Sequence, residues 1–506
     1  MNTNKILNLL VLVSISLCFI FFNSCKREYS TTTGWEYNNP ENGGFEVAPY
    51  QEQITGPGLV FIEGGRFTMG RTEEDVMKDW DNYPRTVTVS SFFMDEAEVS
   101  NLAYLEYLHW LYRVFVPVDF ISVYAKALPD TACWRDKLSY NEPYVEYYLR
   151  HPAYRDYPVV GVSWIQAVNY CAWRTDRVNE QILVDLGLID QTNEPTAEGY
   201  FNTDAYLMYP DYEKNSDRRL QYILTGEERN ARMEDGILLP RYRLPTEAEW
   251  EFAALGLIGN TLQERILERR TYPWNGHFAR TDDKKFYGSM VANFKRGRGD
   301  YMGVAGNLND VADYTSPVIY YWPNDYGLYN MAGNVAEWVM DVYRQVSVDD
   351  MTDLNPYRGN YYTTPKLLDD GTIDDRIDDG DKVGQVPMVP VSDFKNDRRR
   401  NYRAADNKNF LDGDWASTYG GGNTEVWQRQ GRNEKANLEM YGKTAYPRGT
   451  YSLVEDKAKV YKGGSWQDMQ YWLSPGQRRF LDENEATAYI GFRCAMARVG
   501  YPNYGK

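Results

Sequence analysis

The side chains that most often carry chemistry, thiols and imidazoles, are few in this 506-residue chain and widely spaced. No CxxC pair occurs in the sequence, which argues against a zinc knuckle. His151 lies in an Arg-His-Pro turn and His277 follows an Asn-Gly step, so neither forms a close-spaced ligand pair. His109 lies in an apolar helical pattern, where a buried structural histidine is the default. The absence of GxSxG argues against a serine hydrolase. The cysteines are Cys18, Cys25, Cys133, Cys171 and Cys494.

The overall composition excludes two classes of partner. The formal net charge is −17, which argues against nucleic acid, because binding to phosphates needs clustered Lys and Arg. The same charge argues against electrostatic attachment to anionic lipid. Hydrophobic residues make up 43% of the chain, so a sizeable core can be buried, and 43 tyrosines offer many rings for partner surfaces. Paired acids such as Asp374-Asp375 are typical of solvated turns rather than of acid–base catalysis.

The first residues predict a lipid anchor. Lys5 precedes a mostly apolar run over residues 6–22, which is typical of a secretory signal. Ser24 before Cys25 resembles the end of a bacterial lipobox, so we expect residues 1–24 to be a lipoprotein signal peptide and Cys25 to be acylated. Two or more fatty chains anchor a protein stably. Ordinary cleavage near Ser24 is the alternative.

The segment after the anchor predicts a tether and a side of the membrane. Residues 25–55 are polar and rich in glycine, and we expect them to form a lipidated tether without packing of their own. An acidic run after the cysteine would resemble a surface-export signal of some bacteria with two membranes. Here the chain reads Lys26-Arg27-Glu28, which favours the periplasmic face of the outer membrane.

Local signals place the elements of a mixed α+β body from about residue 56. Strands are predicted at 59–62, 66–70, 86–89 and 92–95. Ser100 predicts a helix start, and Ser163 with Gln166 and Thr246 with Glu249 predict capping boxes. The first helix should bury an apolar stripe that comprises Leu102, Leu105, Leu108 and Tyr112. Two stretches without such periodicity, about 176–241 and 343–459, are expected to be loop insertions on one core.

Five sequence blocks in one order resemble the sulfatase-modifying-factor (formylglycine-generating enzyme) domain over most of residues 56–499. The resemblance implies a large, irregular fold related to C-type lectins, with little regular secondary structure. The blocks are FIEGGRFTMG at 61–70, PVVGVSW at 158–164, RLPTEAEWE at 243–251, GLYNMAGNVAEW at 327–338, and YKGGSW at 461–466 followed by GFRC at 491–494.

The same resemblance locates a reactive centre that has lost its thiols. In the active family two cysteines after Gly-Gly-Ser hold a copper ion, and those positions fall on Asp468 and Leu473. A carboxylate and an alkyl chain cannot replace thiolates, because Cu(I) selects soft sulfur ligands. Ser465, at the family's active-site serine, is then a polar turn residue. We therefore expect no enzyme activity and neither copper nor iron.

The resemblance also implies structural calcium. The ligands of a first site fall on Asn330, Gly333, Val335 and Glu337, through side-chain oxygens of the first and last and carbonyls of the other two. The alternative is that Glu337 caps a helix or pairs with an arginine. A second site would use Asn293, Asp310 and the carbonyls of Phe294 and Ala312, in a loop that departs from the family pattern.

Two cysteines correspond to a disulfide of the family. Those positions are Cys171 and Cys494, and an oxidising compartment permits the bond. Closing so long a loop is worth roughly 4–5 kcal/mol in the chain-entropy model. Two buried free thiols are the alternative. The family's other bridge falls on Ala254 or a neighbour and on Arg478, so both halves are missing.

Several N-terminal stretches resemble gliding-motility lipoproteins of the type IX secretion machinery, among them 33–35, 43–45, 76–81 and 174–180. The resemblance implies a non-catalytic outer-membrane scaffold. Its expected partners are the membrane, other gliding and secretion proteins including a sibling lipoprotein, and further copies in an oligomeric assembly. A glycan- or peptidoglycan-binding module is the alternative, because a lectin-like body rich in Tyr and Trp suits stacking on sugars. A divergent metal-dependent oxidase is the weaker alternative.

Overall fold

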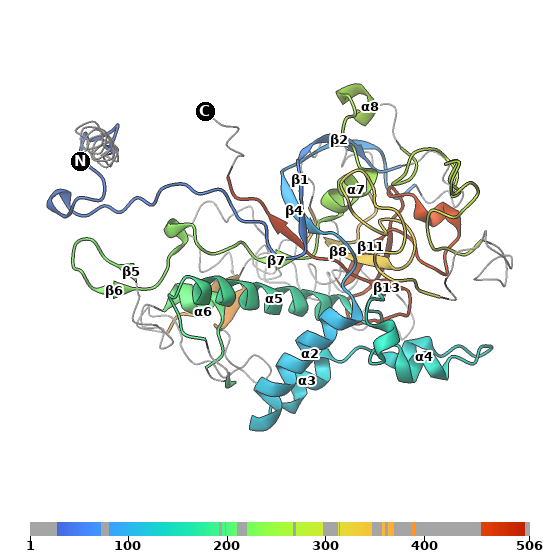
Figure 1. Ribbon diagram of the computed structural model, residues 1–506, viewed down its shortest axis with the longest axis horizontal. Helices are drawn as coiled ribbons and strands as arrows, with labels where there is room; N and C mark the ends of the chain where they lie inside the picture. Colours follow the sequence, from blue (N-terminus) through green and yellow to red (C-terminus); the bar gives the residue numbers. More distant parts are fainter. Residues whose placement is uncertain are drawn as a thin grey trace, which may run out of the picture.

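The computed structural model describes most of the body of the chain (Figure 1). The predicted signal peptide, Cys25 and Asp310 lie outside the described part, as does most of the second insertion. The described residues are 28–71, 80–191, 195–197, 199–209, 220–266, 270–296, 312, 314–346, 357–359, 363–368, 386–390 and 457–500.

Two small four-stranded sheets form the centre of the body. The strand order is β1-β4-β14-β7 in one sheet and β12-β11-β8-β13 in the other. The strands of the first sheet are β1 (Leu59–Ile62), β4 (Phe92–Asp95), β14 (Ala495–Ala497) and β7 (Tyr242–Arg243). Those of the second are β12 (Arg479–Asp482), β11 (Ala458–Lys462), β8 (Ala336–Val342) and β13 (Ile490–Gly491).

Short hairpin-like pairs complete the β structure. Strand β2 pairs with β3, β5 with β6, and β9 with β10, all antiparallel. The four strands predicted at the start of the body are confirmed within one residue at each end. The paired strands are β2 (Gly65–Met69), β3 (Arg85–Val89), β5 (Leu220–Gln221), β6 (Glu228–Arg229), β9 (Thr363–Pro365) and β10 (Met388–Pro390).

The three helices with predicted start signals, α2, α5 and α7, begin where the sequence predicts. Ser163 and Gln166 form a reciprocal capping box at the start of α5, and Thr246 and Glu249 form one at α7. Figure 1 shows α5 lying along the lower side of the sheets, next to β7. The helices are α2 (Asn101–Phe115), α3 (Ile121–Ala127), α4 (Glu142–Tyr147), α5 (Trp164–Asp185), α6 (Thr203–Met208), α7 (Glu247–Leu255) and α8 (Leu262–Ile266).

Helix α2 buries a mixed face of aromatic and aliphatic side chains that includes only part of the predicted stripe. Tyr104 and Leu108 are buried, whereas Leu102 and Tyr112 are more than half exposed. The ring of Tyr104 stacks on Tyr170 of α5, with centroids 5.7 Å apart. The predicted stripe was therefore wrong in its phase, because the ring partner on α5 selects the face of α2 that turns inward.

The first insertion has a small core of its own, which the loop interpretation missed. Helix α5 continues to Asp185, well past the expected start of the insertion at residue 176. Its last turns pack against α6 and the β5–β6 hairpin. The buried residues of this cluster are Leu183, Leu188, Ile189, Phe201, Tyr206 and Ala231.

Residues 28–47, here called the N-terminal knob, form a compact hydrogen-bonded unit. An antiparallel bridge joins Tyr29 to Glu36. The side chain of Asn38 bonds the backbone of Val47 in both directions, donating to its carbonyl at 3.0 Å and accepting from its N–H at 2.7 Å. This mimics a strand pair, so the knob has order that its polar composition did not predict.

The segment from the knob to β1 is fastened to the body rather than free. Glu46 forms ion pairs with Arg229 at 3.1 Å and Arg232 at 2.6 Å, beside the β5–β6 hairpin. Farther on, Glu52 pairs with Arg498 at 2.8 Å. The expectation that residues up to 55 form a tether without packing is therefore wrong for residues 28–55. The predicted insertion supplies the two cations that bind Glu46, and the C-terminal Arg498 binds Glu52.

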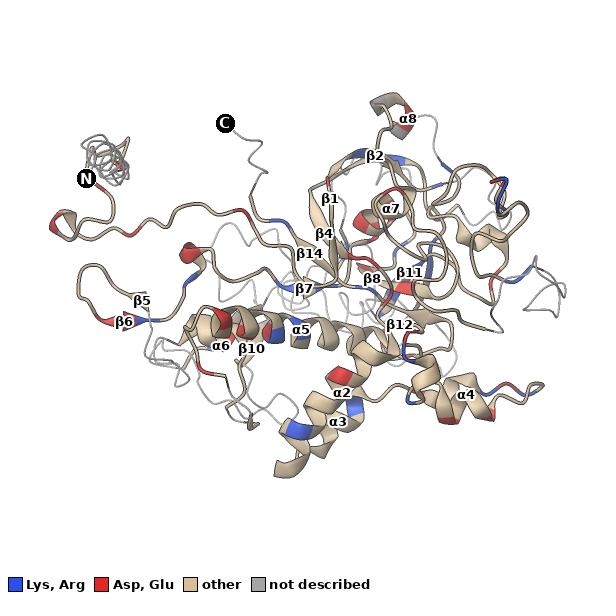
Figure 2. Cartoon of the chain, in the orientation of Figure 1, with Lys and Arg blue, Asp and Glu red and all other residues tan. Residues whose placement is uncertain are grey.

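Charged residues of both signs are interspersed over the described chain, as Figure 2 shows. Helices and strands are both present and mostly short, so the predicted mixed α+β class is confirmed. Within the described residues, no helix combines the length and the apolar character needed to cross a bilayer.

Candidate functional site

A glycine turn follows β11 and leads to the reactive centre that the family resemblance implies. Gly463 and Gly464 have φ angles of +96° and +67°, in the left-handed region that favours glycine. A Cβ on Gly464 would lie 2.8 Å from the carbonyl oxygen of Trp472 and 3.0 Å from a methyl carbon of Leu473. The turn therefore packs tightly against the end of the 3₁₀ helix η9 (Gln470–Leu473).

Asp468 lies in this turn with both carboxylate oxygens occupied. Arg479 of β12 donates to the two oxygens at 2.6 and 2.7 Å, and Ser465 Oγ donates to Oδ2 at 2.5 Å. The guanidinium of Arg479 also lies over the rings of Tyr461 and Trp472, with its central carbon 4.8 and 4.7 Å from their centroids. Burial alone would lower the pKa of Arg479, but the hydrogen bonds and charge of Asp468 raise it above its usual value. The guanidinium of Arg479 therefore stays charged.

Leu473 is fully buried in an apolar cluster. Its hydrophobic neighbours come from the 270–296 segment and from the turn before β8. An alkyl side chain fills this position as part of the core. The cluster comprises Tyr272, Ala279, Met290, Ala292, Phe294, Ala332 and Leu473.

These residues do not fit the copper ion that the sequence resemblance associates with the turn. Cu(I) requires soft thiolate or thioether ligands. Asp468 supplies a hard oxygen donor that is already bound to a guanidinium, and Leu473 supplies no donor atom. No chemical step through copper follows from this arrangement.

The histidines do not assemble into a metal site in the described part of the chain. His109 is exposed on α2, so the expectation of a buried histidine was wrong. His151 accepts a hydrogen bond from Ala153 N–H at 3.1 Å, as a surface-turn residue does. His277 lies 3.2 Å from the hydroxyl of Thr271. Among the described residues, no three His, Cys, Asp or Glu side chains gather closely enough to hold a metal ion.

The first predicted calcium set lies on one turn before β8. Asn330 and Asn334 have positive φ angles of 52° and 62°, as does Gly333 at 81°, so the backbone curls sharply here. Glu337 accepts three hydrogen bonds: Arg493 donates to each oxygen at 2.7 Å, and Trp250 Nε1 donates to Oε2 at 2.8 Å. The structure therefore shows the alternative given above, in which Glu337 pairs with an arginine.

The hydrogen bonds of Glu337 leave one acceptor site on its carboxylate for a cation. A carboxylate offers about four lone-pair sites, and the three bonds from Arg493 and Trp250 leave one of them on Oε1. Asn330 uses its amide nitrogen for Glu98 at 2.8 Å and Val318 O at 3.0 Å, so its oxygen is not engaged by those bonds. The residues fit calcium in donor type, and Asn330, Glu337 and the carbonyls of Gly333 and Val335 would hold it. Calcium binding stays a prediction.

Glu98 is a buried carboxyl at this turn that the sequence analysis did not single out. Asn334 Nδ2 donates to both of its oxygens at 3.1 Å, and Asn330 Nδ2 donates to Oε2. Burial, together with the charge of Glu337, raises the pKa of Glu98 to about 8. Arg493 bonds Glu337 and acts on Glu98 only through its charge, so the cluster carries an excess negative charge when both carboxyls are ionised. No local motif marks Glu98, because its partners are more than 200 residues away.

The second predicted calcium set is described in part. Asn293 is buried and donates from Nδ2 to Tyr314 O at 2.7 Å, and its carbonyl accepts from Asn334 N–H at 2.8 Å. It therefore adjoins the first set. Phe294 and Ala312 are also buried. Asp310 lies outside the described residues, so this site also stays a prediction.

Cys171 and Cys494 meet as the family resemblance implies. Their sulfurs are 3.5 Å apart, and both are free buried thiols in this structure. Burial raises the pKa of Cys494 well above its usual value, and the neighbouring Cys171 raises it further. The fold brings the two cysteines together, but a disulfide has an S–S length near 2.05 Å. The bond itself therefore stays a prediction. Arg478, at the missing second bridge, instead forms a buried ion pair with Glu247 at 2.8 Å.

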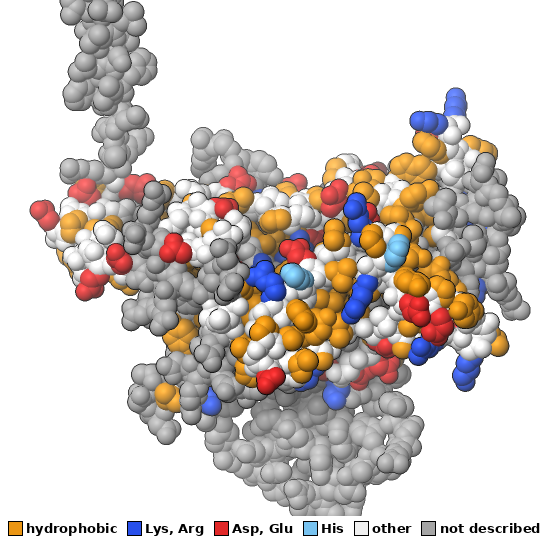
Figure 3. Space-filling model, turned by 60° about the horizontal axis from the view of Figure 1, so that its bottom comes forward, with side chains coloured by type: hydrophobic (Ala, Val, Ile, Leu, Met, Phe, Trp, Pro, Cys, Tyr) orange, Lys and Arg blue, Asp and Glu red, His pale blue; other side chains and the backbone are white. Residues whose placement is uncertain are grey.

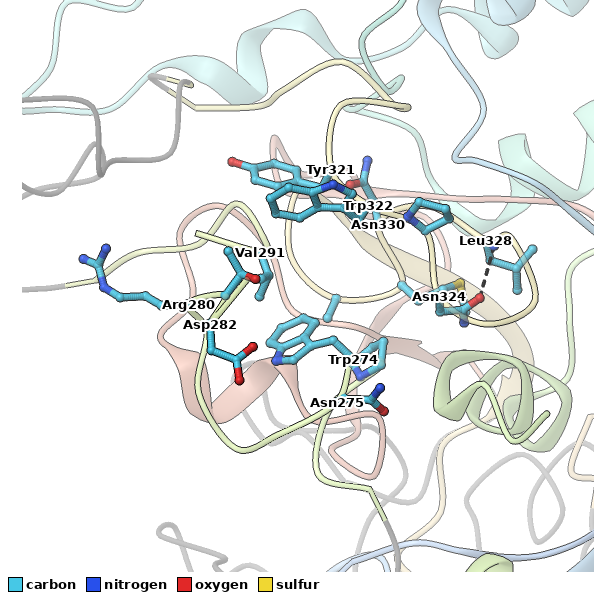
Figure 4. A pocket seen from close by; sticks show the side chains of 15 residues that line it. Trp274, Asn275, Arg280, Asp282, Val291, Tyr321, Trp322, Asn324, Leu328 and Asn330 are labelled. Atoms are coloured by element: carbon cyan, nitrogen blue, oxygen red, sulfur yellow. Dashed lines mark hydrogen bonds between the residues drawn. The ribbon is translucent and has the colours of Figure 1, made fainter. Parts of the chain in front are cut away.

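A cavity of about 260 Å³ adjoins the cluster that buries Leu473, with Ala332 lining it. Figure 4 shows Tyr321 and Trp322 along one side and Trp274 and Asn275 along another. Arg280 and Asp282 add charges of both signs. Sequence analysis missed this site, although the run of rings at 320–322 was a signal.

Comparisons with known proteins agree with this description. The model of the sulfatase-modifying factor enzyme 1-like domain matches residues 44–498. A formylglycine-generating enzyme of Mus musculus is 27% identical over 284 residues, which cover 56% of this chain and 58% of the enzyme. An inactive C-alpha-formylglycine-generating enzyme 2 of the same species is 26% identical over 318 residues, or 58% of this chain and 71% of that protein. The structure of PvdO from Pseudomonas aeruginosa aligns with a TM-score of 0.39 and 15% identity, covering 87% and 93% of the two chains.

Proposed function

Because the chain belongs to the sulfatase-modifying factor enzyme 1-like family, we propose that it is a member that retains the fold without oxidase activity. The observation that carries this proposal is the ion pair of Asp468 with Arg479 at the position of one copper thiolate. Leu473, in the apolar core, takes the position of the other. The family includes proteins named as inactive alongside named enzymes, so loss of activity has a precedent among the relatives.

We further propose that the protein is an outer-membrane lipoprotein, anchored through Cys25 on the periplasmic face, with a structural role in gliding motility and type IX secretion. The support is the N-terminal resemblance to the gliding-motility lipoprotein GldJ, which extends through the capped helix at 174–180. Its partners would be other components of that machinery, including the sibling lipoprotein GldK, in an oligomeric assembly. Structural calcium would stiffen the body.

One surface supports a role in binding other proteins. Figure 3 shows hydrophobic side chains gathered on the face that carries α2, α3 and α4. Within α2, α3 and the turn that joins them, Tyr112, Val118 and Ile121 are each between 46% and 61% exposed. Monomeric proteins rarely expose large contiguous apolar patches, and where such patches occur they mark interaction sites.

Two measurements test the proposal separately. Metal analysis of the purified protein, with an assay of turnover on a cysteine-containing peptide, tests the loss of catalysis. Copper or iron at one per chain together with turnover would overturn it. Affinity capture of the acylated protein from its native envelope tests the scaffold role. The expected result is co-purification of gliding or secretion components, and capture of none of them would contradict that role while leaving the first conclusion intact.

The cavity beside Leu473 favours one second candidate, a glycan-binding module. Trp274 and Trp322 offer ring faces for stacking on sugars, and Asn275 and Asp282 offer polar groups for hydroxyls. Calorimetry with soluble peptidoglycan fragments tests it. Binding that Trp322→Ala removes, and that Trp35→Ala leaves unchanged, would favour this candidate, and absence of heat for the wild-type protein would exclude it for those fragments.

A further inference from the structure

The N-terminal knob exposes large apolar side chains although its backbone is well bonded. Tyr29 is 55% exposed, Trp35 60% and Phe45 67%, and Leu224 from the adjoining β5–β6 loop is 59% exposed. Scattered apolar residues are ordinary on a surface, but three of these four come from one small unit and the fourth comes from the loop that adjoins it. Rings held in water by a rigid backbone are available to whatever surface the knob meets.

The fold gathers these side chains from three short segments. The bridge between Tyr29 and Glu36 brings Trp35 back beside the start of the knob. Phe45 packs edge-on against Tyr37, with ring centroids 5.8 Å apart. Gly44 lies against the hairpin loop so closely that a Cβ there would be 2.9 Å from the Cβ of Leu224. The hairpin loop and the knob therefore present one shared surface.

The length of chain before the knob decides what this surface faces. Tyr29 lies four positions after Cys25, and four steps of a fully extended chain span at most about 14 Å. If Cys25 carries acyl chains, as the proposed function holds, the knob is confined to the bilayer surface. Tyr and Trp are the side chains that prefer the membrane–water interface, because a ring and a polar group meet in each of them.

The charge of the knob selects the kind of lipid surface. Residues 28–47 contain no Lys or Arg and four glutamates, of which Glu46 is paired with Arg229 and Arg232. The remaining Glu28, Glu36 and Glu41 outnumber Lys26 and Arg27, which precede the knob, so anionic headgroups would repel this end of the chain overall. A zwitterionic surface lacks that repulsion and still offers an interface for the rings.

We propose that the N-terminal knob, together with Leu224, is a membrane-contact surface that lies in the headgroup region of a zwitterionic leaflet, with Trp35 and Phe45 entering the interface. This inference rests on the proposed lipid anchor. Because Glu46 fixes the knob to the cations beside β5–β6, the contact would also set how the whole body stands on the membrane. The first insertion would then serve to orient the body.

Tryptophan fluorescence of the full acylated protein in lipid nanodiscs tests the inference. The probe is phosphatidylcholine brominated near the headgroup, which quenches rings within contact distance. We expect quenching of the wild-type protein, and we expect most of it to disappear in Trp35→Phe. Trp322→Phe is the matched control, because Trp322 is similarly exposed, at 49%, and lies at the cavity instead. Replacing part of the lipid with phosphatidylglycerol should weaken the quenching.

The outcomes separate this inference from the anchor. Mass spectrometry of the N-terminal peptide reports whether Cys25 is acylated, and an unmodified cysteine would overturn the anchor itself. If Cys25 is acylated but Trp35→Phe retains the full quenching, or Trp322→Phe removes it, the proposed membrane-contact surface is wrong. The anchor is not affected by either result. A circular dichroism spectrum equal to that of wild type shows that each variant folds.

Discussion

Arg479 binds both oxygens of Asp468, at 2.6 and 2.7 Å, from the neighbouring strand β12 and between the rings of Tyr461 and Trp472. The position to which the family resemblance assigns a metal-binding thiol is here one end of an ion pair. The negative charge of this carboxylate is balanced by a cation from the neighbouring strand.

Breaking this pair should destabilise the fold. Arg479→Met leaves Asp468 buried without its cation, and removal of one partner of a buried pair costs about 3–5 kcal/mol. Chemical denaturation measures the change in the free energy of unfolding. Asp156→Asn is the matched control, because Arg155 and Asp156 form a pair that is about 60% exposed, where a loss of about 0–1 kcal/mol is expected. Equal losses in the two variants would contradict the structural role of Asp468.

Leu473 should behave as a core residue. Leu473→Ala opens a cavity in the cluster around Phe294 and Ala332, and such truncations cost about 2–5 kcal/mol. The same experiment on Leu138, which is 96% exposed, should give a change within about 0.5 kcal/mol. The midpoint of urea unfolding measures both. A Leu473→Ala protein as stable as wild type would mean that the emptied centre is not packed as core.

The buried carboxyl of Glu98 predicts a fall in stability from acid to neutral pH. Its pKa is raised from an ordinary value of 4.5 to about 8 in the folded protein, so the folded state holds a proton that the unfolded state releases. Its contribution is fully present below pH 4.5 and is lost as the pH rises to about 8. Asp341, whose pKa is raised to about 7 by burial and by the charge of Glu247, acts in the same direction.

Unfolding free energies measured between pH 5 and pH 8 test this assignment. Glu98→Gln should flatten the decline, because glutamine does not titrate. Glu142→Gln is the control, since the hydrogen bond from Arg135 lowers the pKa of Glu142 and keeps its titration below this range. A decline that stays as steep in Glu98→Gln as in wild type would assign it to other groups.

Calcium should raise the melting temperature if the turn before β8 binds it. A divalent cation would neutralise the excess negative charge of Glu98 and Glu337 beside the single guanidinium of Arg493. Asn330→Gly tests the site, because glycine adopts the positive φ of 52° and removes the ligating oxygen. The expected result is a calcium-dependent shift in wild type, measured against EDTA by calorimetry, and none in the variant. The same shift in both proteins would place calcium elsewhere.

The contact between Cys171 and Cys494 predicts a disulfide in protein matured in an oxidising compartment. Alkylation and mass spectrometry should then modify Cys133 and spare the other two until a reductant is added. Reduction should cost roughly 2–5 kcal/mol of stability, with no further effect of reductant on Cys171→Ala. Alkylation of all three thiols in denatured, unreduced protein would show that the pair is free, as it is in this structure.

Local signals in the sequence determined the parts of this protein that depend on neighbours along the chain. The capping boxes of Ser163 and Thr246 close over three residues, so their chemistry is complete within the motif. That Asp468 and Leu473 carry no thiol is likewise readable from the sequence alone. Such features need no knowledge of distant contacts.

The tertiary structure alone decided which distant groups satisfy these residues. Asn330 lies 232 positions from Glu98, and Glu46 lies 183 positions from Arg229, and no periodicity relates either pair. The buried face of α2 was set by Tyr170 of another helix rather than by its own leucines. Burial makes an unpaired charge or a misplaced ring costly, so the folded core selects partners by proximity in space, which the order of residues does not record.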